Sequence, residues 1–174
     1  MISNSLVLFY SWSGNTRRAA RIISKKAGAE LAELQPVTPY PPDRPTALRR
    51  AEQERRERTF PALRPLSTDW RRYETVFLGT PNWCDTPAPP IFSFLYQAMP
   101  LNKSIIPFCT HDGGGAGKIS EHIAHYCIGC DILPLLALRG NDVDNEQQID
   151  RWLSRVEHIL ELLHREYQSR ETGF

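Results

Sequence analysis

The sequence contains no apolar run that approaches the roughly 20 residues needed to span a bilayer. It also has no excess of one charge, because 21 basic residues stand against 20 acidic ones and the formal net charge is +1. Such a balance gives no bulk attraction to nucleic acid or to a membrane surface. We therefore expect neither as a partner.

Features of a secreted protein are missing as well. The start of the chain, Met1 to Asn4, lacks the charged segment of a signal peptide. The four cysteines, Cys84, Cys109, Cys127 and Cys130, do not make a disulfide framework in a chain of 174 residues. The expected location is the reducing cytoplasm.

The sequence also lacks the residue sets of the common hydrolases and nucleotide-binding loops. No Ser/His/Asp set and no pair of carboxylates stands out. The glycine-rich run that ends at Lys118 fails the P-loop pattern, because only three residues separate Gly113 from Gly117 and Ile119 replaces the required Ser or Thr. Its third glycine also comes one residue too early for the dinucleotide pattern.

What the sequence does contain is a series of short apolar runs that alternate with helical patterns. The expected strands cover residues 6–10, 29–34, 75–79, 104–109 and 132–138. The expected helices cover residues 17–27, 47–58, 91–98, 119–126 and 149–167. Pro107 and Pro134 weaken the last two strands, because proline cannot donate a ladder hydrogen bond.

This alternation predicts an α/β fold, a doubly wound parallel sheet with helices on both faces. Residues 36–69 form a long, polar, proline-rich connection that carries one charged surface helix. With no repeats, the chain is expected to be one domain covering residues 1–174.

Ligand-binding residue types follow three of the expected strands, in residues 11–16, 80–87 and 110–117. In a doubly wound sheet these loops fall on one rim, at the carboxyl ends of the strands, where ligands bind. The first loop combines hydroxyls, an amide and a glycine with the start of a helix, whose free N–H groups favour an anion. We expect it to hold the phosphate of a cofactor.

The other two loops leave alternatives open. Trp83 offers a face on which a heteroaromatic ring could stack, or it packs into its own loop. The glycines of residues 113–115 let the backbone approach a ring edge, or they form a flexible connection. Arg17 and Arg18, in the first turn of the helix, either help an anion to bind or are solvated, and we favour solvation.

The three segments resemble the flavodoxin family. Tyr10 to Thr16 is similar to the family's phosphate loop, Gly79 to Trp83 to a loop beside the flavin, and Phe108 to Gly114 to the third loop of short-chain members. The resemblance runs from about Leu6 to the last helix and implies a five-stranded sheet of order 2-1-3-4-5 with non-covalent FMN.

Carried over to this chain, the resemblance implies three groups of cofactor-binding residues. The phosphate would bind to Ser11, Ser13, Asn15 and Thr16 and to the amides of Trp12 and Gly14. The flavin ring would be flanked by Pro81, Asn82, Trp83 and Cys84 and edged by Thr110, Asp112, Gly113, Gly114 and Gly115. Cys84 is expected to be a simple contact rather than a redox partner. His111 could donate a proton to a reduced substrate, hydrogen-bond the flavin or have no role.

A separate group, His122, His125, Cys127 and Cys130, includes a zinc-like Cys-x-x-Cys spacing. The group is compressed into one helix end, so we expect buried structural thiols there and neither a metal nor a redox dithiol.

Function is expected to be redox. The leading hypothesis is an FMN-dependent reductase that passes electrons from a nicotinamide or protein donor to an acceptor, either a partner protein or a small molecule. The alternatives are a flavodoxin electron carrier and an interaction module without flavin. Carrier flavodoxins are usually strongly acidic, so the near-neutral charge of this chain favours the reductase. The oligomeric state stays open.

Overall fold

The structure is a computed structural model, and it describes residues 2–171. Its strands are β1 (Ser5–Phe9), β2 (Glu30–Glu33), β3 (Thr75–Trp83), β4 (Thr86–Pro87), β5 (Ser104–His111), β6 (Asp131–Ile132) and β7 (Leu136–Arg139). Its α-helices are α1 (Asn15–Ala27), α2 (Arg44–Glu57), α3 (Pro89–Ala98), α4 (Ile119–Tyr126) and α5 (Glu146–Glu171).

The main sheet is parallel and has the order β2-β1-β3-β5-β6, with β7 beside β5 and the short β4 antiparallel to β3. Since β6 and β7 share the outer position, the five positions follow the order 2-1-3-4-5. The expected fold class is therefore confirmed. The switch point, where the chain reverses direction across the sheet, lies between β1 and β3.

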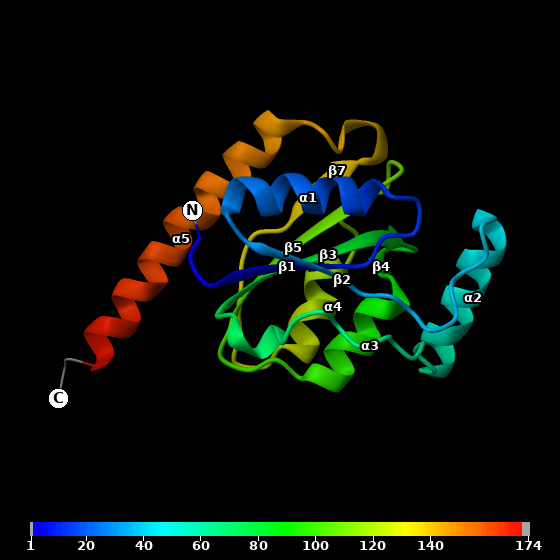
Figure 1. Cartoon of the computed structure of the whole chain (residues 1–174), viewed down its shortest axis with the longest axis horizontal. Helices are drawn as coiled ribbons and strands as arrows, with labels where there is room; N and C mark the ends of the chain where they lie inside the picture. Colours follow the sequence, from blue (N-terminus) through cyan, green and yellow to red (C-terminus); the bar gives the residue numbers. More distant parts are fainter. Residues whose placement is uncertain (1, 172–174) are drawn as a thin grey trace.

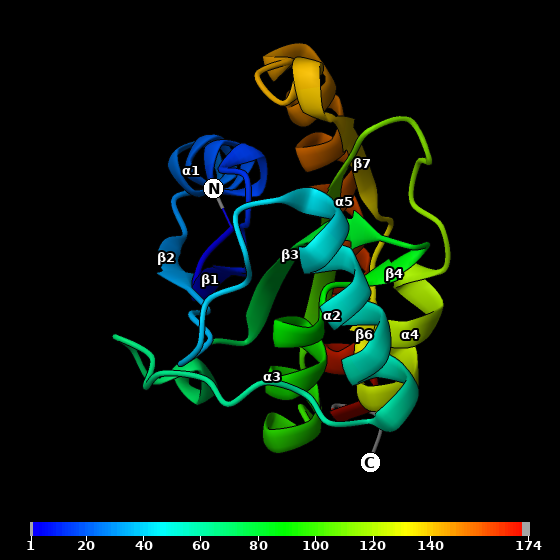
Figure 2. The same cartoon turned by 90° about the vertical axis from the view of Figure 1, so that its right-hand side faces the viewer.

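Helices cover both faces of the sheet, as Figures 1 and 2 show, and each face has its own core. On one face α1 and α5 pack over a cluster that includes Phe9, Phe77 and Phe108. On the other face α3 and α4 cover a cluster that includes Leu8 and Leu78. Successive residues of a strand point to opposite faces, so these unalternating apolar strands fill both cores at once.

The last expected strand, residues 132–138, is interrupted. β6 ends at Ile132 and β7 begins at Leu136, with Pro134 between them. β6 pairs with residues 104 and 105 of β5, and β7 pairs with residues 108–111. The carbonyl of Ile105 accepts a hydrogen bond from the Leu133 amide, so the backbone of Ile105 faces β6. Residues two apart on a strand direct their backbone groups to the same side, so the nitrogen of Pro107 faces the gap between β6 and β7. Neither Pro107 nor Pro134 therefore removes a hydrogen bond from the sheet.

Four helices, α1, α2, α3 and α5, begin two or three residues earlier than expected, and two of them have a recognisable start signal. Asp43 caps α2, accepting a hydrogen bond of 3.0 Å from the Thr46 amide. α3 starts on Pro89 and Pro90, whose missing N–H groups cost nothing in a first turn.

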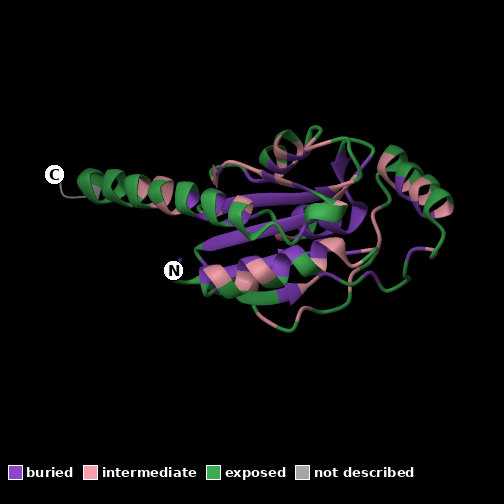
Figure 3. Ribbon diagram, turned by 90° about the horizontal axis from the view of Figure 1, so that it is seen from above, coloured by how far each residue is buried: buried purple, intermediate pink, exposed green. Residues whose placement is uncertain are grey.

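Two helical segments reach beyond the sandwich. α2 buries only Ala47 and Ala51 and stands beside the carboxyl ends of the strands (Figure 1). The second half of α5 extends past the sheet at the opposite end, and Figure 3 shows it mostly exposed. Among residues 2–171, no helix is long and apolar enough to cross a membrane.

Replacing Gly79 by alanine tests how tightly the centre of the sheet is packed. A Cβ atom on Gly79 would lie 2.1 Å from the Phe108 ring, so the ring or the strand must shift. We expect Gly79→Ala to lower the free energy of unfolding in urea by about 1–3 kcal/mol, the usual cost of overpacking. Gly114→Ala is the control, since its nearest neighbour would be 3.9 Å away and its φ is not positive. Equal stability of the two variants would contradict this packing.

Candidate functional site

The carboxyl ends of β1, β3, β5 and β7 meet at one rim of the sheet. β1 pairs with β3, and β3 with β5, in a continuous parallel register. The three loops expected to lie together are therefore neighbours at this rim. One of them differs from the expectation: residues 80–83 continue β3, and residues 82–87 form a hairpin with β4, because Cys84 and Asp85 adopt the positive φ angles of a two-residue turn.

The first loop is held in shape by the hydroxyl of Ser11. Its Oγ accepts hydrogen bonds from the amides of Gly14 and Arg17, both at 3.2 Å. Gly14 has a φ of 98°, a left-handed conformation that suits glycine. Thr16 is buried, and its Oγ1 lies 2.7 Å from Oγ1 of Thr110, which ties the start of α1 to the end of β5.

The second and third loops are bound to each other. The side-chain amide of Asn82 donates a 2.7 Å hydrogen bond to the Gly115 carbonyl, and the Lys118 amide donates to the Asp85 carbonyl at 2.8 Å. Gly117 lies so close to Asp85 that a Cβ would approach its Cα to 2.6 Å. These contacts show that the third loop is anchored to the hairpin and is not a free connection.

Trp83 belongs to an aromatic cluster. It is 6% exposed, and the rings of Tyr10, Trp12 and Tyr40 meet it edge-on, at centroid distances of 5.9, 6.2 and 5.1 Å. The indole of Trp12 in turn donates a 3.0 Å hydrogen bond to the Pro41 carbonyl. The Trp83 ring is therefore covered by other aromatic rings in this structure.

A cavity of about 200 Å³, which we call the rim cavity, lies among the three loops. Eight residues expected from the sequence line it: Trp12, Ser13, Asn15, Pro81, Asn82, Trp83, Thr110 and Asp112. The other seven do not line it: Ser11, Gly14, Thr16, Cys84, Gly113, Gly114 and Gly115. Ser11, Gly14 and Thr16 instead shape the first loop, and Cys84 lies in the exposed hairpin turn.

Asn82, which lines the rim cavity, carries an unsatisfied acceptor. Its Oδ1 atom is buried and is the one such side-chain atom without a hydrogen-bond partner among residues 2–171. Leaving a buried acceptor unpaired costs about 1–3 kcal/mol. A ligand with an N–H group at this position would remove that cost, and the amide donor of Asn82 is already fixed by Gly115.

His111 presents a hydrogen-bond donor at the rim. Its Nδ1 accepts a 3.0 Å hydrogen bond from the Gly113 amide, so the neutral ring carries its proton on Nε2. His111 lines the rim cavity, so a ligand held there would have this polar side chain as a neighbour.

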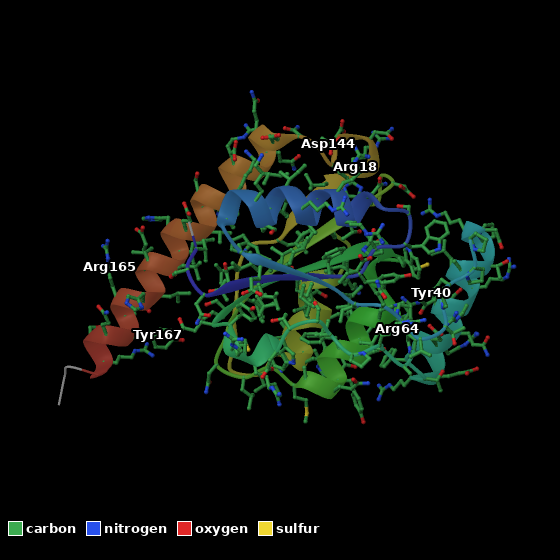
Figure 4. The ribbon with its side chains drawn as sticks, in the orientation of Figure 1. Arg18, Tyr40, Arg64, Asp144, Arg165 and Tyr167 are labelled. Atoms are coloured by element: carbon green, nitrogen blue, oxygen red, sulfur yellow. The ribbon has the colours of Figure 1, made fainter. Side chains whose placement is uncertain are left out.

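The arginines of the first turn of α1 are ion-paired. Arg17 makes two hydrogen bonds to Glu33, of 3.0 and 2.6 Å, and its side chain is 38% exposed. Arg18 pairs with Asp144, and Figure 4 shows the two side chains together above α1. Both arginines therefore have acidic partners. The sequence analysis expected solvated side chains and did not foresee these ion pairs.

Two residues of the site were missed from the sequence. Arg44, at the start of α2, lines the rim cavity and pairs with Asp112. Gly140 lies where a Cβ would be 2.9 Å from Nδ2 of the Asn15 side chain. The Asp43-Arg44-Pro45 sequence is a helix start signal that could have placed Arg44, whereas nothing local marks Gly140.

The histidine and cysteine group near the end of α4 does not bring three potential metal ligands together in the described part of the chain. Among residues 2–171, no three His, Cys, Asp or Glu side chains are placed to share a metal ion. Cys127 is buried, and the His122 ring packs edge-on against Phe92 at 5.6 Å. Desolvation lowers the pKa of His122, as expected for a histidine that packs against an aromatic ring.

A flavodoxin family model matches residues 4–156, almost the whole sandwich. The chain belongs to the flavodoxin family. This confirms the resemblance seen in the three loops, and the match covers the long connection between β2 and β3 as well. No curated protein matches the chain.

Solved structures agree with this assignment. A flavoprotein of Lactobacillus acidophilus NCFM in complex with FMN is 26% identical, with a TM-score of 0.68 over 86% of this chain and 97% of that one. The apo form of the flavoprotein from the same organism is 24% identical, with a TM-score of 0.61 over 83% and 97%. An NADH:FMN oxidoreductase in its apo form shares the fold alone, at 12% identity and a TM-score of 0.50 over 86% and 88%.

Thiol labelling tests the packing around the site. Burial raises the pKa of Cys109 and of Cys127 to about 12, and the thiolate is the form that reacts with iodoacetamide. At pH 8 we expect Cys84, in the exposed hairpin turn, to be alkylated at least about a hundredfold faster than Cys109 or Cys127. Peptide mass spectrometry measures the rates, and labelling in urea is the control. Rapid labelling of Cys109 in the folded protein would refute its buried position.

Proposed function

We propose that the chain binds FMN at the rim cavity and acts as an FMN-dependent reductase. The observation that carries the cofactor assignment is the buried, unpaired Oδ1 of Asn82, a residue that lines a cavity built from all three rim loops. The pyrimidine-like edge of a flavin has an N–H donor between two carbonyl acceptors. Asn82 can accept from that N–H, and His111 can donate to a carbonyl.

The first loop supplies the phosphate end of the proposed site. Ser13, Asn15 and the helix start after Gly14 gather hydrogen-bond donors at the positive end of α1. Arg17 is held away by Glu33, so neutral donors are left as the main ligands of the phosphate. The bound flavin would supply the hydride and electron chemistry, and the chain would bind it, orient it and exclude water.

The rim cavity is smaller than the roughly 300–1,000 Å³ of typical ligand sites. Entry of a whole flavin therefore requires a wall to move. The Arg44–Asp112 ion pair is the part of the wall that can move at low cost, since its two side chains are 50% and 57% exposed. The start of α2 would then close again over the bound ring.

A reductase fits this chain better than a free electron carrier. Carriers meet basic partner proteins through strongly acidic surfaces, and this chain has a net charge of +1. The comparisons establish the family and leave the activity open, so the choice rests on charge.

Comparing FMN with riboflavin tests the two ends of the site separately. We expect Asn15→Ala to weaken FMN about 10- to 100-fold, the worth of one charge-assisted hydrogen bond, and to leave riboflavin almost unchanged. Asn82→Ala removes a contact to the ring and should weaken both ligands by the same factor. Titrations followed by flavin fluorescence measure the affinities, with Ser154→Ala on exposed α5 as the control. If the protein bound neither FMN nor riboflavin, the assignment of a flavin to the rim cavity would be wrong.

Turnover without a partner protein tests the reductase. The FMN-loaded protein, mixed with NADH or NADPH and a quinone, should oxidise the nicotinamide in proportion to enzyme concentration, as read by absorbance. A carrier would be reduced by dithionite and pass electrons to a redox protein, but it would not turn over with the nicotinamide. That second pattern would overturn the reductase and leave FMN binding intact.

A further inference from the structure

The two cysteines at the end of α4 are the first and last residues of a tight turn. The Cys130 amide donates a 3.1 Å hydrogen bond to the Cys127 carbonyl, and Gly129, at the third position, has a φ of 78°. Both features are typical of a type II turn, in which the first and fourth Cα atoms are less than about 7 Å apart. A disulfide needs a Cα separation of about 4.4–6.8 Å, so the turn brings the two cysteines within bonding reach.

The two thiols are in contact with each other. Burial raises the pKa of the Cys127 thiol to about 12, and charge repulsion and a hydrogen bond from the Cys130 thiol contribute to the rise. The Cys130 thiol also donates a 3.3 Å hydrogen bond to the Pro100 carbonyl. The sequence predicted structural thiols at this helix end and gave no sign of a contact between them.

The two sulfurs differ in their access to solvent. Cys127 is 2% exposed, whereas Cys130 is half-buried. Apolar side chains surround the more accessible sulfur, because Ile128, within the turn, is 75% exposed and Leu101, which follows Pro100, is 61% exposed. An incoming molecule therefore reaches Cys130 before Cys127, through apolar surroundings of the kind that mark contact surfaces.

The thiol pair lies at the opposite end of the sheet from the rim. β6 begins directly after Cys130 and pairs with residues 104 and 105 of β5, whereas residues 110 and 111 line the rim cavity. Figure 2 shows β6 beside α4. About five residues of strand separate the two places, which corresponds to roughly 15–20 Å. A thiol cannot react with a flavin over this distance, so the pair would act as a centre of its own.

We propose that Cys127 and Cys130 form a dithiol–disulfide redox centre, separate from the flavin site, that reacts with a disulfide brought by another molecule. The Cys130 thiolate attacks one sulfur of the incoming disulfide, which forms a mixed disulfide and releases the other half as a thiolate. Cys127 then loses its proton and attacks the Cys130 sulfur, so the second half leaves as well. In total, two protein thiols are oxidised to one disulfide, and the incoming disulfide is reduced to two thiols that take up the two protons.

The contact between the sulfurs is what makes the second step possible. The raised pKa of Cys127 keeps its thiolate scarce, so this thiol would be a poor nucleophile toward a molecule in solution. Toward the mixed disulfide on Cys130 its attack is intramolecular, and well-placed groups within one molecule have a very high effective concentration. None of these steps requires a bound flavin, so the centre stands or falls independently of the proposed function.

Oxidation of the whole chain by a neutral disulfide tests the centre. The starting protein is the fully reduced Cys84→Ser variant, because the exposed Cys84 would form a mixed disulfide of its own. We expect hydroxyethyl disulfide to lower the protein mass by two hydrogens, a peptide map to link Cys127 to Cys130, and dithiothreitol to reverse the change. An unchanged mass, or a protein that stops at a stable mixed disulfide, would overturn the proposal.

Two variants in the same Cys84→Ser background test the order of attack. In Cys127→Ala the mixed disulfide cannot be resolved, so we expect a trapped mercaptoethanol adduct on Cys130. In Cys130→Ala the buried Cys127 should form its adduct at least about tenfold more slowly. Mass spectrometry measures both rates, with the fully buried Cys109 as the internal control, which should stay unmodified.

Equal adduct rates in the two variants, with circular dichroism showing both folded, would refute the assignment of Cys130 as the attacking thiol. If either variant did not fold, the mass change of the Cys84→Ser protein would still decide whether the centre exists.

Discussion

The parallel pairing of β1, β3 and β5 is the constraint on which the rest of the structure depends. Phe9 pairs with Gly79, and Gly79 pairs with Phe108. This register brings the ends of three strands from distant parts of the chain to the same level at the rim. A slip of one residue would exchange the two buried faces of a strand and separate the loops. Gly79 permits this register, because the Phe108 ring occupies the space that a side chain there would need.

Once the strands are in step, hydrogen bonds between loops complete the rim. Thr16 meets Thr110 across the first and third loops, and Asn82 meets Gly115 across the second and third. Only the Oδ1 acceptor of Asn82 is left buried and unpaired within the described residues. Under the proposed function, a ligand that brings a donor would satisfy this acceptor.

The connection between β2 and β3 has more influence on the site than its composition indicates. Its apolar content is too low to form a core, and α2 buries only two alanines. Arg44 nevertheless reaches Asp112, Arg55 donates to the Cys84 carbonyl, and Tyr40 covers Trp83. Polar and aromatic contacts add to the burial of Tyr40, Ala47 and Ala51 in holding this segment over the rim.

Local sequence determined most of the fold, because the strand and helix signals lie within short windows. The apolar runs and the helical patterns identified the elements and their order, and the meeting of the three rim loops followed from the parallel sheet. Proline positions were harder to interpret. From the sequence, Pro107 and Pro134 weakened the prediction of two strands. Only the pairing of β5 with both β6 and β7 showed that the two prolines lie at the gap between β6 and β7.

The sequence by itself therefore determined the fold class, the family and the rim at which the three loops meet. Tertiary structure alone decided which side chains share a cavity. Trp83 is covered by Tyr10, Trp12 and Tyr40, Arg44 joins Asp112, and Gly140 makes room for Asn15, through contacts between residues far apart in the chain. Secondary-structure signals act over a few residues, whereas packing depends on distances that exist only after the chain has folded.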